Sequence, residues 1–145
     1  RVLRGFSAER FVAARRRNGL SVSDLSRLAK VGTSTVHAWE AGRATPQIDL
    51  LARIMQILET PISEVVTVDP DERYPGDLRV IKGLTQPQLA AAARIATTTL
   101  RGIERADLAL TDTNAATLAR LLGIGVDEYR AAYQRARERP PGVSV

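Results

Sequence analysis

The sequence contains no cysteine and a single histidine, His37. These absences exclude disulfide bonds, thiolate metal sites and metal sites built from several histidines. No apolar run approaches the roughly 18 residues that a membrane-spanning helix requires, and no signal peptide is visible. The chain begins at Arg1 rather than methionine, from which we expect that an N-terminal segment is missing.

Lysine is also scarce, so arginine carries nearly all of the positive charge. The chain has 21 Lys and Arg against 16 Asp and Glu, a net charge of +5. Residues 1–66 hold ten cations and six anions (+4), whereas residues 67–145 hold eleven and ten (+1). Arginine suits bidentate contacts with phosphates and bases. A mild basic excess permits nucleic-acid binding without establishing it.

A pattern of small, apolar and turn residues recurs at a spacing of 64 positions. Gly19-Leu20-Ser21 returns as Gly83-Leu84-Thr85. An internal repeat of this length predicts two small domains of related fold. The other matched positions are Leu25 and Leu89, Ala29 and Ala93, Val31 and Ile95, Thr33 and Thr97, Val36 and Leu100, and Glu40 and Glu104.

Helix start and stop signals predict an all-α chain with five helices in each half. Ser21 with Asp24, and Thr85 with Gln88, have the spacing of capping boxes. Thr45-Pro46 is typical of an N-cap followed by proline at the first helical position. The predicted helices span residues 8–17, 22–29, 33–40, 46–58 and 62–66, and then residues 77–82, 86–93, 97–105, 113–122 and 126–139.

These helices group into two predicted domains, residues 1–66 and residues 76–145, the second with an extended C-terminal helix. Residues 67–75 contain two prolines and an acidic run, which predicts a linker. On the last helix, Tyr129 and Tyr133 form an apolar stripe that either packs on its own domain or serves a dimer. We expect the arginines at 135, 137 and 139 to form a solvated tail, with phosphate contact as the alternative.

The short turn at residues 30–32 joins two predicted helices. Its length matches the turn of a DNA-binding helix-turn-helix. Leu25 and Ala29 on the first of these helices, with Val36 and Trp39 on the second, supply the apolar faces that such a motif needs. In this motif the second helix enters the major groove with its N-terminal residues at the bases.

The segment "GLSVSDLSRLAKVGTSTVHAWEAGRATPQIDLLARIMQIL" resembles the XRE family of Cro- and phage-repressor-type helix-turn-helix domains. The segment "KGLTQPQLAAAARIATTTLRGIERA" resembles it independently. The resemblance implies two tandem five-helix, λ-repressor-like domains joined by a short linker. It also implies operator DNA as the partner, because most members of the family are regulators that bind operators.

The resemblance carries DNA-contacting positions onto each repeat. Arg101 can grip a guanine in bidentate fashion, and contact with phosphate or solvent alone is its open alternative. The family prefers glutamine at the start of the second helix as a phosphate contact, which Gln86 matches and Val22 does not. Arg43 lies in a loop suited to phosphate, and Arg105 is the nearest cation in the second repeat. The implied base-facing residues are Thr33, Ser34, His37 and Ala38, and then Thr97, Thr98, Arg101 and Gly102.

Two arginines are expected to have a structural role instead. Arg15 lies 25 positions before Glu40, and Arg79 lies 25 positions before Glu104. The family resemblance places such a pair between the first helix and the end of the third. We therefore predict two semi-buried ion pairs that orient the recognition helices, with unrelated surface charges as the alternative.

These inferences predict a sequence-specific DNA-binding transcriptional regulator, and more specifically a repressor. Double-stranded DNA is the expected partner, a homodimer is left open, and no cofactor, metal, small-molecule ligand or membrane contact is predicted. His37 has no nucleophile or orienting acid nearby in sequence, so no enzymatic activity is expected. The expected location is the cytoplasm of a bacterial cell, or of a cell infected by phage, at the nucleoid.

Two alternatives remain at this level. In the first alternative only the first domain binds DNA, and the nearly neutral second domain serves dimerisation or partner docking. The other is an antitoxin of a toxin–antitoxin pair, a role that XRE domains also fill. If both domains read DNA, a connection of about ten residues, reaching about 33–36 Å, would let one chain cover two half-sites one DNA turn apart.

Overall fold

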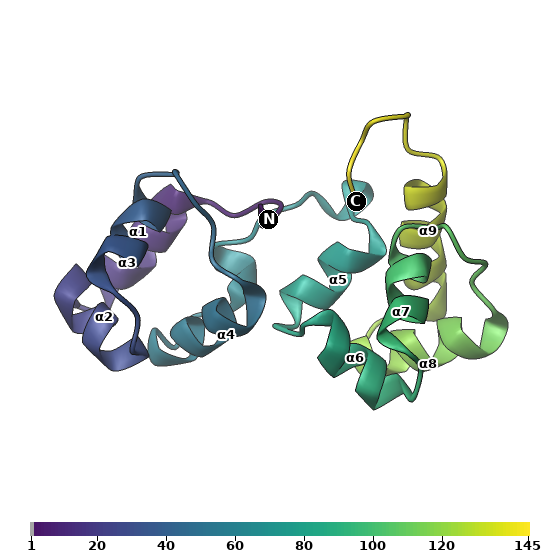
Figure 1. The fold of residues 1–145 in the computed structure, drawn as a ribbon, viewed down its shortest axis with the longest axis horizontal. Helices are drawn as coiled ribbons and strands as arrows, with labels where there is room; N and C mark the ends of the chain where they lie inside the picture. Colours follow the sequence, from purple (N-terminus) through teal and green to yellow (C-terminus); the bar gives the residue numbers. More distant parts are fainter. Residues whose placement is uncertain (1) are drawn as a thin grey trace. The chain divides into compact units, whose positions relative to one another are not determined.

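The computed structural model describes residues 2–145 and divides the chain into two compact units, one up to Thr67 and one from Val68 onward. Both units are helical, and the predicted all-α class is confirmed (Figure 1). Within residues 2–145 the only β-type pairing is an isolated antiparallel bridge between Phe6 and Val66. No helix in this range is long and apolar enough to cross a membrane.

The first unit consists of four α-helices followed by one turn of 3₁₀-helix. Ser7 caps the first helix by accepting a hydrogen bond from the backbone N–H of Arg10 at 3.2 Å. The elements are α1 (Ala8–Arg17), α2 (Val22–Ala29), α3 (Thr33–Glu40), α4 (Ile48–Ile57) and η1 (Ile62–Glu64).

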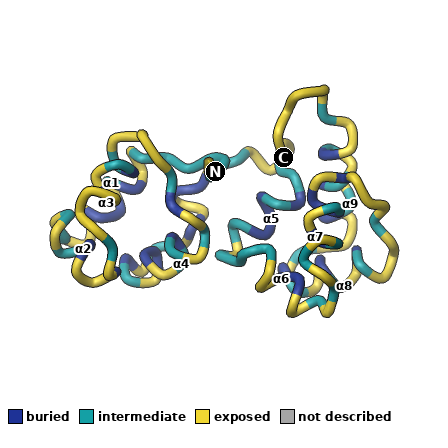
Figure 2. Tube along the Cα trace, viewed as in Figure 1, coloured by how far each residue is buried: buried dark blue, intermediate teal, exposed yellow. Residues whose placement is uncertain are grey.

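The core of the first unit collects one apolar face from each α-helix (Figure 2). Phe11 of α1 lies edge-on to Trp39 of α3, with ring centroids 6.1 Å apart and planes at 88°. Such edge-to-face packing of aromatic rings is favourable beyond the area that it buries. The same core fully buries Leu25, Val36, Leu51 and Ile54.

The second unit repeats this arrangement with five α-helices after a short 3₁₀-turn. A longer final helix takes the place of the 3₁₀-turn that closes the first unit. The elements are η2 (Pro70–Glu72), α5 (Pro75–Ile81), α6 (Gln86–Ala93), α7 (Thr97–Glu104), α8 (Asp112–Leu122) and α9 (Val126–Arg137).

Tyr129 of α9 lies at the centre of the second core and is fully buried. It packs with apolar side chains of the other helices, including Leu89, Leu100 and Leu118. Tyr133 is half-buried beside this core, and its hydroxyl donates to the carbonyl of Leu108 at 2.7 Å. The tyrosine stripe therefore packs on its own unit rather than forming a free surface.

Several predicted helix boundaries were wrong. Thr45-Pro46 does not open α4, because the Thr45 hydroxyl accepts a hydrogen bond from the Leu3 N–H at 2.7 Å and the helix begins at Ile48. The predicted helix 62–66 is a single 3₁₀-turn, since Val65 and Val66 turn toward the bridge with Phe6. In the second unit, Pro75 starts α5, and the other boundaries differ from prediction by two residues or fewer.

The predicted linker is partly structured. Pro70–Glu72 forms η2, and Asp69 caps it by accepting from the Asp71 N–H at 3.0 Å. Arg73 donates to the Val68 carbonyl at 3.1 Å, and its own carbonyl accepts from Arg135 of α9 at 2.7 Å. Most of the predicted linker is thus attached to the second unit, and Arg135 is a structural tie rather than part of a solvated tail.

Candidate nucleic-acid interface

Each unit contains a helix-turn-helix whose first helix begins with a complete capping box. In α2, the Ser21 hydroxyl accepts from the Asp24 N–H and the Asp24 carboxylate accepts from the Ser21 N–H, both at 3.0 Å. These hydrogen bonds hold the pKa of the Asp24 carboxyl below its ordinary value. Thr85 and Gln88 form the same box in α6, at 3.2 and 2.8 Å. Both boxes fix where the helix starts.

The predicted recognition helices α3 and α7 begin differently, without a side-chain cap. Gly32 precedes α3 and Ala96 precedes α7, and neither residue has a side chain that can accept a hydrogen bond. The first N–H groups of a helix have no partner within the helix and carry partial positive charge. In each unit the N–H groups of the first two helical residues are therefore left for an acceptor outside the helix, as a base edge or a phosphate would provide.

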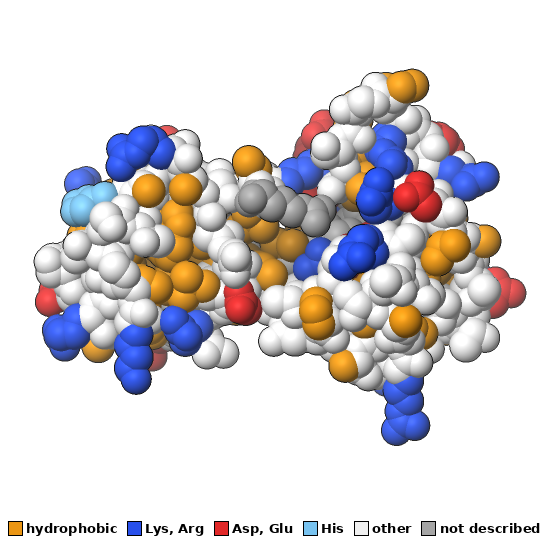
Figure 3. Space-filling view, in the orientation of Figure 1, with side chains coloured by type: hydrophobic (Ala, Val, Ile, Leu, Met, Phe, Trp, Pro, Cys, Tyr) orange, Lys and Arg blue, Asp and Glu red, His pale blue; other side chains and the backbone are white. Residues whose placement is uncertain are grey.

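The exposed face of α3 carries several predicted base-facing residues. Thr33, Ser34 and His37 are exposed, whereas Ala38 is half-buried. The side chain of His37 makes no hydrogen bond or ion pair with any described residue, and neither does the side chain of Arg43 in the loop that follows. The first unit thus presents hydroxyl, imidazole and guanidinium groups together, and all of these can bond to bases or phosphates. Side chains of Lys and Arg project from the surface of both units (Figure 3).

The corresponding face of α7 is less open. Thr98 and Arg101 are exposed, and the Arg101 side chain has no polar partner within residues 2–145, but Thr97 is half-buried. Gly102 is covered by the side chain of Leu108. A Cβ atom added at Gly102 would lie 2.6 Å from both Cγ and Cδ1 of Leu108. Leu108 is itself 46% exposed, so it presents an apolar surface where the first unit presents Ala38.

The loops after α3 and α7 share a backbone frame but differ in charge. The N–H of Arg43 donates to the Ala38 carbonyl at 2.9 Å, and the N–H of Asp107 donates to the Gly102 carbonyl at 2.8 Å. Asp107 therefore occupies the place that Arg43 has in the first unit. Arg105, predicted to contact DNA, lies 3.4 Å from Asp107 in an exposed ion pair.

The structure brings both predicted ion pairs together. Arg15 donates to Glu40 through Nε at 2.7 Å and Nη2 at 2.9 Å, and its Nη1 donates to the Leu20 carbonyl at 2.8 Å. The hydrogen bonds to Glu40 raise the pKa of the Arg15 guanidinium above its ordinary value. This pair connects the end of α1 to the end of α3, the predicted recognition helix.

The second pair is more enclosed and has an additional partner. Arg79 donates to Glu104 through Nε at 2.7 Å and Nη2 at 3.1 Å. Gln86, predicted to contact phosphate, instead donates its amide to Glu104 at 2.9 Å. The Glu104 side chain is 5% exposed, compared with 12% for Glu40. Sequence reasoning missed this contact because it treated the start of α6 apart from the end of α7.

Comparison with known proteins agrees with this geometry. A sequence model described as a helix-turn-helix domain matches residues 8–67, and a model described as helix-turn-helix matches residues 77–129. The chain belongs to the XRE family. No curated protein and no solved structure matches it. Two XRE-type domains in tandem indicate a DNA-binding regulator.

The backbone of Lys30 and of Arg94 adopts a left-handed conformation that favours glycine, and sequence reasoning overlooked both residues. They occupy equivalent places in the two XRE-type motifs, at the turn before the recognition helix, with a φ of 57° in each case. Left-handed backbone favours glycine, so a cation at this position in both units is strained. Aligning the two repeats shows a basic residue at the same turn in each, and this match could have been noticed from the sequence.

Within residues 2–145, no group of three or more His, Cys, Asp or Glu residues could hold a metal ion. The predicted DNA-facing positions of the two XRE-type domains instead carry hydroxyl, imidazole and guanidinium groups among their side chains. Groups of these kinds are able to form hydrogen bonds and ion pairs with nucleic acid.

Proposed function

We propose that this protein is a sequence-specific transcriptional repressor that reads operator DNA with α3 and α7. The observation that carries the proposal is the pair of recognition helices with uncapped N-termini, each bearing exposed donors on its first two turns. Direct readout requires such donors at base edges in the major groove. We place the protein in the cytoplasm, where such a regulator meets its operator.

The two reading surfaces differ in chemistry. In the first unit His37 is exposed and Ala38 is half-buried. In the second unit the matching places are held by Arg101 and Gly102, the latter covered by Leu108. A single chain with two different surfaces would read two half-sites of unlike sequence. Linking the two units also raises the effective concentration of the second contact once the first has formed.

Titration of the full chain against a duplex selected from random DNA tests this function. His37→Ala should weaken binding to the selected duplex by about 1–3 kcal/mol while leaving binding to unrelated duplexes unchanged, because it removes a base contact. Gln56→Ala, an exposed change on α4, is the control and should alter neither. Equal losses on selected and unrelated DNA would show that His37 does not read bases.

Repression itself needs a cellular measurement. A reporter gene placed behind the selected site should fall in expression when the protein is present. Expression should rise again when the His37→Ala variant replaces the unaltered protein. Raised expression with the unaltered protein would indicate an activator and contradict the repressor assignment.

A second candidate function is that only the first unit binds DNA, while the second docks a partner or a second copy of the chain. Three observations favour it: Gln86 bonds to Glu104, Leu108 covers Gly102, and Asp107 stands in the place of Arg43. Arg101→Ala distinguishes the two. Unchanged DNA affinity would favour docking, and a loss confined to one half-site would favour reading by α7.

A further inference from the structure

Leu108, in the loop after α7, is an apolar side chain held against the outer face of that helix. It lies on Gly102, one of the predicted base-facing positions, so closely that no Cβ atom fits at position 102. Glycine inside a helix lowers the stability of the helix. The second unit therefore gives up a helix-forming side chain at this position for one supplied by the loop, and Leu108 still remains 46% exposed.

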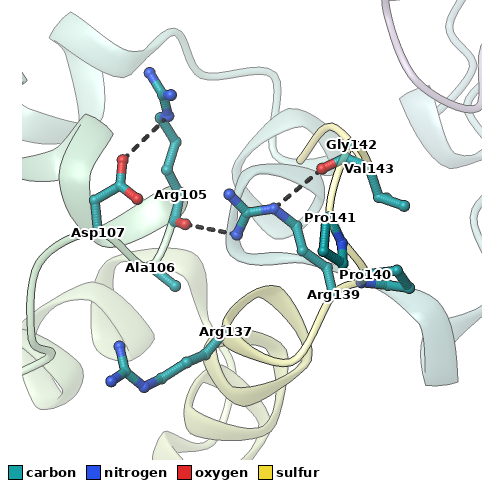
Figure 4. Close-up of a pocket in the computed structure, with 9 residues that line it drawn as sticks. All are labelled: Arg105, Ala106, Asp107, Arg137, Arg139, Pro140, Pro141, Gly142 and Val143. Carbon is teal, nitrogen blue, oxygen red and sulfur yellow. Dashed lines mark hydrogen bonds and ion pairs between the residues drawn. The ribbon is translucent and has the colours of Figure 1, made fainter.

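The loop that carries Leu108 is fixed by hydrogen bonds on several sides. The N–H of Leu108 donates to the Gly102 carbonyl at 3.1 Å, and its own carbonyl accepts from the Tyr133 hydroxyl of α9 at 2.7 Å. At the start of the same loop, Nη1 of Arg139 donates to the Arg105 carbonyl at 2.7 Å (Figure 4). Leu108 is thereby held in one position beside α7, and a group ordered in advance loses little conformational freedom on binding.

The first unit has the same backbone contact with different side chains. The N–H of Ala44 donates to the Ala38 carbonyl at 3.3 Å, as that of Leu108 does to Gly102. Two alanines thus stand where the second unit has glycine on the helix and leucine on the loop. The hydroxyl that fixes this loop comes from α9, a long helix whose place is taken by a 3₁₀-turn in the first unit. The larger apolar group beside α7 is therefore a feature of the second unit alone.

The neighbours of Leu108 limit what could cover it. Thr98 and Arg105 lie one turn from Gly102 on the same face of α7, and both are exposed. The exposed Arg101 side chain has no polar partner within residues 2–145, and the Arg105 side chain makes only a weak, exposed ion pair. An apolar protein surface would have to desolvate both guanidinium groups. The major groove of DNA instead offers phosphates and base acceptors to the arginines and the methyl group of thymine to the leucine.

We propose that Leu108 contacts the C5-methyl group of a thymine in the half-site read by α7, so that a residue outside the recognition helix helps to determine specificity. The proposal rests on the proposed function, that α7 reads DNA. Thymine is the only one of the four bases that presents a methyl group in the major groove, and apolar side chains recognise it there. The half-site should therefore contain a thymine close to the base that Arg101 contacts.

Uracil in place of thymine tests this contact, because the two bases differ only by the methyl group. In a duplex selected by the full chain, the half-site that responds to Arg101→Ala is identified first. Each thymine in that half-site is then replaced by uracil in turn, at one fixed salt concentration. One of these replacements should weaken binding by about fourfold, as expected for the burial of one methyl-sized group.

Leu108→Ala should abolish this discrimination, so that the variant binds the thymine and uracil duplexes equally. The measured quantity is a ratio of two affinities of one protein, which a general loss of stability does not change. Leu108→Met keeps an apolar side chain of similar volume and should retain most of the ratio. The matched control is Leu28→Ala on α2, whose leucine is also 46% exposed, and it should leave the fourfold ratio intact.

5-Methylcytosine is the other base that carries the same methyl group. Cytosine and 5-methylcytosine are therefore compared at the sensitive position, each paired with guanine. A gain from the methyl group that disappears in Leu108→Ala would support the proposal and extend it to methylated DNA. No gain in either protein, with the uracil effect retained, would support it for thymine alone. A gain of equal size in both proteins would overturn it.

The remaining outcomes separate this proposal from the proposed function. If uracil weakens binding by Leu108→Ala as much as by the unaltered chain, or if the half-site contains no thymine, the methyl contact is overturned. The response to Arg101→Ala then leaves the proposed function standing. If Leu108→Ala dissociates a dimer in analytical ultracentrifugation with the uracil ratio unchanged, Leu108 belongs to a protein interface instead. If no duplex is selected, or none responds to Arg101→Ala, both proposals fail together.

Discussion

The two units carry the same backbone and opposite charges at the loop after the recognition helix. Arg43 in the first unit and Asp107 in the second donate their N–H groups to equivalent carbonyls, those of Ala38 and Gly102. The side chains above this common frame are a cation in one unit and an anion in the other. The hydrogen-bonded frame of the motif therefore does not determine the charge of the surface above it.

The same contrast holds inside the motif. In the first unit α2 begins with Val22, whose side chain cannot hydrogen-bond to the Arg15–Glu40 pair. In the second, Gln86 joins Arg79 and Glu104. Gln86, predicted to contact phosphate, is instead bonded inside the second unit.

The largest effect is expected from substitutions that break these ion pairs. Glu104→Ala should destabilise the second unit by about 3–5 kcal/mol, because Arg79 is left buried without its partner. Glu40→Ala should cost the first unit less, since Glu40 is 12% exposed and lacks the extra amide donor. Thermal or urea unfolding of the two variants measures the difference. A larger loss for Glu40→Ala would contradict the greater enclosure of the second pair.

The stability of the second unit should depend on alkaline pH through Tyr129. The first unit contains no tyrosine and should lack this dependence. Burial raises the pKa of the Tyr129 phenol well above its ordinary value, and the nearby Glu104 carboxylate adds to the shift. A raised pKa in the folded state favours the neutral phenol. The stability it contributes is therefore complete below about pH 10 and is lost as pH rises above that value.

Tyr129→Phe should remove this alkaline loss from the second unit. It should also raise stability at pH 7 by about 1 kcal/mol, since the buried hydroxyl has no hydrogen-bonding partner in the described structure. Urea unfolding at pH 7 and pH 10.5 compares the variant with the unaltered chain. Equal alkaline sensitivity in both proteins would assign the effect to other groups.

The contact between Gly102 and Leu108 can be measured by a double-mutant cycle. Gly102→Ala gains about 1 kcal/mol of helix propensity but pushes its Cβ into Leu108, so the net change should be near zero. With Leu108→Ala present, the same change should stabilise the unit. We expect a coupling of about 1 kcal/mol between the two sites. Simple additivity would mean that Leu108 does not rest on Gly102 in solution.

The smallest expected effects concern the turns, where the two units should behave alike. Lys30→Gly and Arg94→Gly each relieve a left-handed residue with a φ of 57° and should stabilise their unit by about 0.5–1 kcal/mol. Hydrogen exchange resolves the two units separately. A gain in one unit only would break the equivalence of the turns.

Sequence reasoning located the framework because capping signals are local. The bounds of α2, α3 and α6 agree with prediction, and Ser21 and Thr85 form the predicted boxes. Thr45 was misread because its hydroxyl bonds to Leu3, 42 positions away. Gln86 was misread for the same reason, since its partner Glu104 belongs to another helix.

The differences between the reading surfaces were only partly visible in sequence. Substitutions such as His37 against Arg101 can be seen by aligning the repeats. The cover that Leu108 places on Gly102 depends on how a longer loop folds back, which no periodicity encodes. The arrangement of Arg139 likewise depends on carbonyls from three separate segments.

The most direct test of the account is selection of bound duplexes from random DNA by the full chain, repeated with His37→Ala and with Arg101→Ala. We predict a site of two unlike half-sites about one DNA turn apart. Each variant should relax the sequence of one half-site and leave the other unchanged. Two identical half-sites, or a single half-site that responds to His37→Ala and never to Arg101→Ala, would contradict the claim that one chain reads DNA with two different surfaces.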